Sequence, residues 1–357
     1  MKVSILGNGL TSLTLAKMLV NEGIKVDVFS DGKNQKINKV QTLGISKSNI
    51  DFFNKKILNI KKFLWEIKKI EIYSDSLKNE EILNFENKNK VLFSILYNFN
   101  LYNSLFSSLN RNKLITFKNK IDYQSLIKKK YNLIFNCDQN HPISKRFFNK
   151  KIDKDYKSFA YITIFQHKNI LNNHIASQIF TPKGPIAFLP ISSRETSVVY
   201  SAKGKRDVNL NEYIKKYNFK YEILKIKETL SFPLKSSNLR SYYHGNIIAF
   251  GDLLHKLHPL AGQGFNMTIR DIKKIHELIE FKNQHGLDLD SSICADFEKN
   301  SKSNNYLFSN GIDLIYEFFN LENKLNTNVI SKSVKFLGKN EIIKNFFIRS
   351  ADNGIII

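Results

Sequence analysis

The segment GDLLHKLHPLAGQGFNM, residues 251–267, gathers an aspartate, two histidines, a proline and three glycines in seventeen positions. These residue types suit an acid–base site, a metal site built on the histidines, or a glycine-lined cradle for a cofactor. His255 and His258 are three apart, but Pro259 follows at once, so no regular helix presents both, and no third ligand is near. An apolar run precedes the segment and a helical pattern follows it. The segment therefore favours a cradle, with no metal.

A second glycine-rich turn, Gly7-Asn-Gly9-Leu-Thr-Ser12, follows the apolar run 2–6. In a dinucleotide-binding turn, glycines let backbone amides approach a pyrophosphate at the positive end of the next helix. Ser12 replaces the third glycine of that pattern. Ser30 stands where the pattern expects an acid, so the acid is either displaced to Asp31 or absent. Alone, the motif is short enough that a plain glycine turn is an open alternative.

A parallel sheet is the element that must position these turns. The runs 2–6, 26–29, 131–136 and 246–250 each have the length and composition of a buried strand that ends in a turn. An apolar-periodic stretch ending at Gly23 connects the first two, which predicts a strand–helix–strand unit. We expect all four strands in one sheet.

The middle of the chain follows a different pattern. Residues 158–202 alternate between apolar and polar side chains and carry proline-marked turns, which predicts an antiparallel sheet. The stretch 68–74 is expected to join this sheet. After residue 264 the pattern becomes helical, with one face at positions 269, 272, 276 and 279, and further helices are expected over 304–350.

The chain is strongly basic. It has 357 residues, 42% of them hydrophobic, with 55 basic against 32 acidic side chains and a net charge of +23. Such charge suits an anionic partner, or it reflects a compositional bias, since lysines are spread over the whole sequence. We favour the bias. Arginines are few and no basic stripe with interleaved aromatics occurs, so no nucleic-acid partner is expected.

Two cysteines, Cys137 and Cys294, lie far apart and form no metal-type spacing. The N-terminus has no signal-peptide pattern, and no apolar run approaches the ~18 residues of a membrane helix. We expect a cytoplasmic protein, with peripheral contact to the inner face of the cell membrane as the alternative.

The residues of the segment 251–271 resemble the second FAD-binding signature of aromatic-ring hydroxylases. The resemblance is greatest to the ubiquinone-biosynthesis hydroxylases, the UbiH-like FAD-dependent monooxygenases. Their signature runs Gly-Asp-Ala-Ala-His-x-x-His-Pro-x-Ala-Gly-Gln-Gly-x-Asn-x-Gly-x-x-Asp. In this chain Leu253 and Leu254 replace the alanine pair, and Thr268 replaces the late glycine.

Four further segments carry the resemblance over nearly the whole chain. Residues 41–46 resemble the family's Arg-Thr-x-Ala-Ile-Ser, with glutamine for the arginine. Residues 136–139 take the place of Gly-Ala-Asp-Gly, with Asp138 matching the acid and glutamine replacing the last glycine. Residues 180–190 resemble a segment of the family's substrate domain, and 311–351 resembles its tail.

The resemblance implies an α/β fold. It consists of a Rossmann-like FAD-binding domain of the glutathione-reductase and p-hydroxybenzoate-hydroxylase type, an antiparallel-sheet substrate domain and C-terminal helices. The implied boundaries are 1–60, 97–150 and 240–285 for the FAD domain, 61–96 and 151–239 for the substrate domain, and 286–357 for the helical segment.

The resemblance also implies roles around the cofactor. Asp252 would accept hydrogen bonds from the ribityl hydroxyls, Pro259 would form a wall beside the flavin, and amides near Gly262 would face the ring edge. The cofactor-binding candidates are Gly7, Gly9, Leu10, Thr11, Ser12, Asp31, Gln41, Asp138, Gly251, Asp252, Pro259, Ala261, Gly262, Gln263, Gly264, Phe265 and Asn266. No catalytic residue is assigned, but the flavin-proximal candidates are His258, Pro259, Gly262, Gln263 and Gly264.

The activity implied is hydroxylation of the ring of a polyprenylated phenol in ubiquinone biosynthesis, through a flavin hydroperoxide formed with dioxygen. The reductant is NAD(P)H or a ferredoxin-type donor. Such a substrate lies in the bilayer, so we expect peripheral membrane contact or association with a quinone-biosynthesis complex. The aromatic stretch 306–319 is a candidate docking face, although an ordinary core helix explains it equally simply.

Two alternatives stay open. The departures at Ser12, Ser30, Gln41 and Gln139 all lie near the expected FAD, which suits a flavoprotein with impaired or no hydroxylase activity, or a hydroxylase of another aromatic substrate. The third hypothesis is a basic nucleic-acid-binding protein with a dinucleotide fold.

Overall fold

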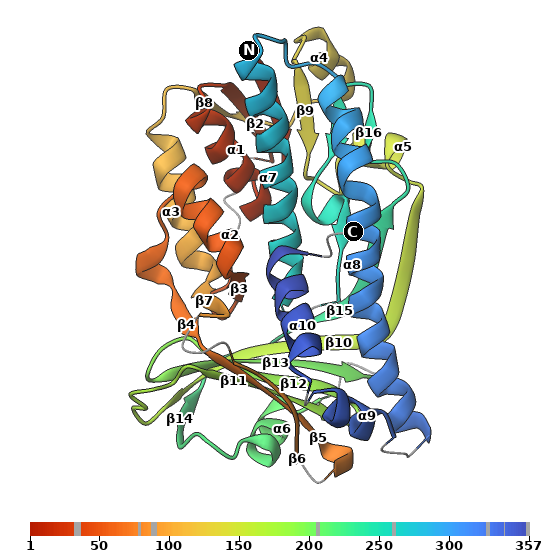
Figure 1. The fold of residues 1–357 in the computed structure, drawn as a ribbon. Helices are drawn as coiled ribbons and strands as arrows, with labels where there is room; N and C mark the ends of the chain where they lie inside the picture. Colours follow the sequence, from red (N-terminus) through yellow and green to blue (C-terminus); the bar gives the residue numbers. More distant parts are fainter. Residues whose placement is uncertain are drawn as a thin grey trace.

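The computed structural model describes residues 1–31, 37–77, 80–86, 91–204, 208–258, 262–325, 329–338 and 340–354. Figure 1 shows two main layers: a parallel sheet with its helices above, and a larger sheet across the bottom. The long helix α8 (Ser292–Leu325) runs along the side of both layers.

The upper sheet has six strands in the order β16-β17-β9-β1-β2-β8. These are β1 (Lys2–Leu6), β2 (Lys25–Ser30), β8 (Ile115–Asn119), β9 (Leu133–Asn136), β16 (Tyr243–His244) and β17 (Ile247–Ala249). All neighbours pair in parallel except β16 and β17. Helix α1 (Leu10–Asn21) connects β1 to β2 and buries its apolar face. The predicted parallel sheet is confirmed, and β8 is an additional edge strand.

The lower sheet has nine strands in the order β18-β15-β10-β13-β12-β11-β5-β6, with β14 pairing to β10. The bounds are β5 (Lys69–Ser74), β6 (Glu80–Glu86), β10 (Lys151–His167), β11 (Ile175–Thr181), β12 (Gly184–Pro190), β13 (Glu195–Lys203), β14 (Ile223–Ile226), β15 (Leu230–Leu239) and β18 (His255–Lys256). The stretch 68–74 does join the sheet, parallel to β11, whereas the other pairs are antiparallel. Two of the prolines, Pro185 and Pro190, lie within β12 rather than in turns.

A small antiparallel sheet stands between these layers, in the order β3-β7-β4. Its strands are β3 (Thr42–Ser46), β7 (Phe93–Tyr97) and β4 (Trp65–Ile67). The sequence did not predict it, because short irregular strands between helices give weak periodicity. It places residues 41–46 next to the start of α7 (Gln263–Gln284).

The helices complete the fold. Short helices are α2 (Lys47–Phe52), α3 (Asn98–Asn110), α4 (Tyr123–Lys128), α5 (Pro142–Phe147), α6 (Leu210–Tyr217) and the turns η1 (Phe53–Ile57), η2 (Lys61–Phe63), η3 (Asp75–Leu77) and η4 (Gly251–Leu253). After α7 and α8 follow α9 (Val329–Leu337) and α10 (Glu341–Asn353). The predicted face of α7 at 269, 272, 276 and 279 is buried, as expected. Among the described residues, no helix is both long and apolar enough to cross a bilayer.

Candidate functional site

The segment 251–266 crosses from one sheet to the other. It leaves the six-stranded sheet at the end of β17, turns at Gly251, and adds β18 to the edge of the nine-stranded sheet by pairing with β15. It then enters α7 at Gly262, which has the left-handed φ of 63° that favours glycine. Pro259 and Ala261 lie outside the described residues. The motif is thus the connection between the two layers.

Gly251 is where this segment touches the N-terminal glycine turn. Its φ is 64°, and a Cβ atom built there would lie 2.7 Å from Cγ2 of Thr11. Only glycine allows this approach between two motifs that are 240 residues apart in sequence. Nearby, the side chain of Gln139 donates to the backbone carbonyl of Asp252 at 2.7 Å. Both contacts bring sequence-predicted cofactor segments together.

The N-terminal turn itself has the expected geometry. Gly7 has a φ of 101°, and a Cβ atom there would lie 3.4 Å from Oγ of Ser12 and 3.5 Å from Asp138. Ser12 is buried where the pattern has its third glycine. Burial raises the pKa of the Cys137 thiol to about 12, and the carboxylates of Asp138 and Asp252 contribute to the rise. Cys137 is therefore protonated and no nucleophile.

His255, the first histidine of the motif, has a structural partner. Its Nε2 contacts Oδ2 of Asp271, and both residues are buried. The other carboxylate oxygen of Asp271 accepts from Nδ2 of Asn305 at 2.9 Å. This cluster ties the loop before α7 to α7 and α8, and it explains why the segment carries both the histidine and the late aspartate.

His258, the second histidine, packs among aromatic rings instead. It meets the ring of Tyr156 at 4.8 Å and that of Tyr316 at 4.3 Å between centroids. Burial, together with the nearby charge of Lys154, lowers the pKa of His258 to about 4. His258 is therefore neutral at physiological pH. The two histidines have separate surroundings and do not act as a pair.

The start of α7 holds the segment 41–46. The amide of Asn266 donates to the carbonyl of Gly44 at 2.9 Å, and its Oδ1 accepts from the backbone N–H of Ser46 at 2.9 Å. A Cβ atom on Gly262 would lie 3.9 Å from the backbone nitrogen of Gly44. Two glycines thus face each other where the sequence placed the flavin ring.

Two buried acceptors in this region, Oδ1 of Asn98 and Oε1 of Gln263, have no hydrogen-bond partner among the residues that the structure describes. Asn98, which the sequence analysis missed, also donates to Gln41, through its side chain at 3.4 Å and its backbone at 3.0 Å. Orphaned acceptors are costly unless a donor reaches them. FAD carries hydroxyl and N–H donors, so these residues fit that cofactor.

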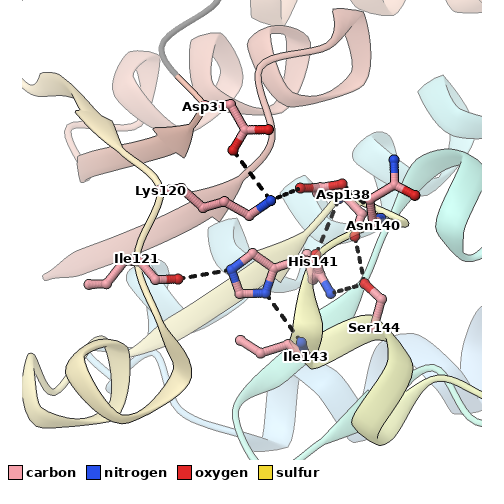
Figure 2. A network of polar contacts seen from close by, with 9 residues as sticks. Asp31, Lys120, Ile121, Asp138, Asn140, His141, Ile143 and Ser144 are labelled. Carbon is pink, nitrogen blue, oxygen red and sulfur yellow. Dashed lines mark hydrogen bonds and ion pairs between the residues drawn. The ribbon is translucent and has the colours of Figure 1, made fainter.

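A charged network lies at the ends of three strands of the six-stranded sheet, β8, β2 and β9 (Figure 2). Nζ of Lys120, just after β8, lies 3.3 Å from Asp31 after β2 and 3.9 Å from Asp138 after β9. The buried ring of His141 fixes this lysine's segment, with Nε2 3.0 Å from the carbonyl of Ile121. Burial lowers the pKa of His141, so it is neutral. The sequence analysis missed Lys120 and His141 because it did not predict β8. Asp31, the acid that it named near this position, lies in the network.

The nine-stranded sheet carries a row of uncharged side chains on the face that contacts β3. Gln178, Ala187 and Val199 stand opposite one another on β11, β12 and β13. Ser197, on the same face as Val199, contacts Thr42 of β3 through their hydroxyls at 2.9 Å. The neighbouring residues of alternate parity pack against α6 instead. A half-buried, uncharged strip therefore lies on the sheet face next to β3.

The sequence relatives are quinone-biosynthesis enzymes. No protein-family model matches the chain. The ubiquinone biosynthesis monooxygenase COQ6 of Schizosaccharomyces pombe is 22% identical over 273 residues, which cover 62% of this chain and 57% of that protein. The 3-demethoxyubiquinol 3-hydroxylase of Escherichia coli is 28% identical over 152 residues, or 40% and 39% of the two chains. The matches thus span about half or less of the relatives' own lengths.

Solved structures show the same fold over nearly the whole chain. The p-nitrophenol 4-monooxygenase PnpA of Pseudomonas putida superposes with a TM-score of 0.77 at 12% identity, covering 99% of this chain and 98% of that one. Klebsiella pneumoniae HpxO, solved with FAD and uric acid, superposes with a TM-score of 0.69 at 11% identity, covering 99% of this chain and 97% of that one. The chain is therefore a relative of the ubiquinone-biosynthesis hydroxylases, with the fold of the FAD-dependent aromatic-ring monooxygenases.

Proposed function

We propose that the chain is an FAD-dependent monooxygenase that hydroxylates the ring of a polyprenylated phenol in ubiquinone biosynthesis. The observation that carries the proposal is the convergence of three distant motif segments: Gly251 on Thr11, Gln139 on Asp252, and Asn266 on residues 44–46. A cradle built from widely separated segments of the chain suits a long dinucleotide cofactor better than a small ligand.

In this proposal the turn from Gly7 to Ser12 receives the pyrophosphate, and Asp252 the ribityl hydroxyls. Gly262, Gln263 and Gly264 supply groups at the flavin edge, with Pro259 beside the ring. The α7 dipole favours negative charge there. Bound FAD, once reduced, would supply the activation of dioxygen. The chain's own contribution is to orient the cofactor and to keep water away with neutral groups such as His258.

The proposed domain division follows from the same assignment. The FAD-binding domain would comprise residues 1–60, 97–150 and 240–285. The substrate domain would comprise residues 61–96 and 151–239, and the C-terminal helical segment, 286–357, would complete the fold. The strip at Gln178, Ala187 and Val199 supports an uncharged aromatic substrate, since it offers no charged side chain. The names of the relatives support a quinone precursor.

The reductant and the location belong to the proposal as well. NAD(P)H or a ferredoxin-type protein would reduce the flavin, and the polyprenyl tail would bring the enzyme to the inner face of the cell membrane or into a quinone-biosynthesis complex. The net charge of +23 supports contact with anionic headgroups, each nearby lysine contributing about 1 kcal/mol.

One observation favours a flavoprotein of reduced activity as the second candidate. Gln41, which stands for the family's arginine, pairs with Asn98, so this position offers the cofactor no cation. Gln139 likewise bonds to Asp252 within the protein. Under this alternative FAD binds, but weakly.

The test has two stages. Purified protein is titrated with FAD, and we expect an oxidised-flavin spectrum and a rise in melting temperature. Ligand at 100 times its Kd stabilises by about 2.7 kcal/mol, which is readily measured. A hydroxylase-deficient, quinone-requiring host then receives the gene. Flavin binding without restored quinone would support the second candidate, and protein that FAD leaves unshifted would contradict both.

A further inference from the structure

An apolar stripe lies exposed along the outer face of α8. Its members are Leu307, Leu314, Phe318 and Leu321, with exposed fractions of 41%, 54%, 47% and 48%. Monomeric proteins rarely leave several large apolar side chains exposed in one line. The opposite face of the same helix is packed, since Tyr316 contacts Tyr156 and His258. The stripe is therefore a surface that something else covers.

The spacing of the stripe indicates a helical partner. Together with Gly311, its positions advance by 4, 3, 4 and 3 residues, which is the a/d repeat by which two helices pack side by side. A Cβ atom on Gly311 would meet no atom of the described part of the chain within 4 Å, so a neighbouring backbone can approach at that point. A lipid surface requires no such period.

The stripe is also complementary to itself when one copy runs in the reverse direction. Centred on Leu314, antiparallel pairing brings Leu307 opposite Leu321 and the small Gly311 within one residue of the bulky Phe318. Leu314 then meets its own copy on the twofold axis. A self-complementary patch is what a twofold dimer requires.

The charged residues around the stripe also indicate which partner covers it. Residues 303–322 contain no lysine or arginine and three acids, in a chain that has 55 basic residues in 357. Two chains of net charge +23 repel each other wherever lysines meet. An anionic membrane would favour lysines beside the stripe, whereas a second copy favours their absence.

We propose that this stripe is a homodimer interface, in which α8 packs antiparallel against α8 of a second copy. This inference is independent of the proposed flavin chemistry. It gives the helix two tasks, because its inner face contacts the His258 segment while its outer face binds the partner. Because α7 packs against α8 in each copy, the dimer would place four helices side by side next to the cofactor segments.

Crosslinking tests the pairing and its direction. The full-length Leu314→Cys variant, treated with a short bismaleimide, is expected to form covalent dimers. Leu307→Cys alone is expected to form few, because antiparallel pairing places the two copies of residue 307 about 21 Å apart along the axis. Mixing Leu307→Cys with Leu321→Cys restores the crosslink. Wild type, with Cys294 buried and Cys137 half-buried, is the blank, and Leu224→Cys, 64% exposed on β14, is the control.

Sedimentation measures the strength of the dimer. Leu314→Glu and Gly311→Leu are expected to raise the dimer Kd at least tenfold, while Leu224→Glu leaves it unchanged; circular dichroism verifies that each variant folds. A monomeric wild type at all concentrations, or equal self-crosslinking at 307 and 314, overturns the proposal. Monomeric protein that binds phosphatidylglycerol vesicles through Leu314 also overturns it and assigns the stripe to a membrane.

Discussion

The two halves of the candidate cofactor site are held together by different forces. In the half at 251–271, buried partners hold one another: the side chains of His255 and Asp271 are 1% and 2% exposed. In the half at 7–31 and 136–141, the corresponding contacts are ion pairs near water: Lys120 is 37% exposed and Asp31 62%. Buried hydrogen-bonded groups fix geometry, whereas exposed ion pairs contribute little and are screened by salt. We call the first region the rigid half of the site and the second the soft half, because buried hydrogen bonds hold the first and exposed ion pairs the second.

The largest expected effect comes from the point where the halves touch. Gly251→Ala would force a left-handed φ on alanine and push its Cβ to 2.7 Å from Thr11. We expect a loss of about 2–4 kcal/mol in unfolding free energy and at least a tenfold rise in the FAD Kd. Gly245→Ala is the matched control, because Gly245 has a φ of 58° but no neighbour within 4 Å. If urea unfolding shows equal losses of unfolding free energy in both variants, the close approach of Gly251 to Thr11 is not the cause.

The second-largest effect is expected on FAD binding by Asp252, in the rigid half of the site. Asp252→Ala should weaken FAD binding about 10- to 100-fold, since a hydrogen bond to a charged group contributes roughly 1.5–3 kcal/mol. Its side chain is exposed, so stability without FAD should not change. Fluorescence titration measures the Kd, with Asp288→Ala, also exposed, as the control. Undiminished flavin occupancy would contradict the ribityl assignment.

Acid should destabilise the rigid half. The pKa of His258 is about 4 in the folded protein, against an ordinary value near 6.5, so below pH 6.5 only the unfolded chain takes up the proton. Stability is therefore lost as the pH falls from 6.5 towards 4, by about 2 kcal/mol at pH 5. Urea midpoints at pH 7.5 and 5 should show a smaller loss for His258→Gln than for wild type. Identical pH slopes would show that His258 is not what titrates.

The smallest effect belongs to the soft half. Lys120→Gln leaves the carboxylates of Asp31 and Asp138 uncompensated where a pyrophosphate would bind. We expect FAD affinity to fall by up to about fivefold at low salt, and less at high salt. Lys120→Arg, which keeps the charge, should retain most of the affinity, and the exposed Lys113→Gln serves as control. A salt-independent loss that Lys120→Arg shares would point to a structural role instead.

Most of the fold was predictable because its strands are buried and their turns are distinctive. The four runs that form β1, β2, β9 and β17 carry mostly apolar sequence, and glycine or an acid follows each within two residues. The edge strand β8, ITFKN, was missed, because only one of its faces is apolar and it is short. The β3-β7-β4 sheet was missed since its pairing depends on long-range contact rather than on local pattern.

The site was predictable where motif and geometry coincide. Gly251, Asp252 and Asn266 were named from the motif, and the fold brings them against the glycine turn, Gln139 and residues 41–46. Their role towards FAD stays a prediction. Lys120 could not be predicted, because its importance arises from strand order in the sheet, which the sequence does not reveal directly. Asn98 has no motif of its own. Its partner Gln41 identifies it only after folding.

The crossing of residues 250–254 between the sheets has a thermodynamic consequence. Five residues separate the last residue of β17 from β18, so a cofactor gripped at Asp252 would hold both layers at once. Binding should then make the two layers unfold as one cooperative unit, whereas without ligand each can open separately. Backbone amides of β15, which pairs with β18, should consequently exchange more slowly when FAD is present.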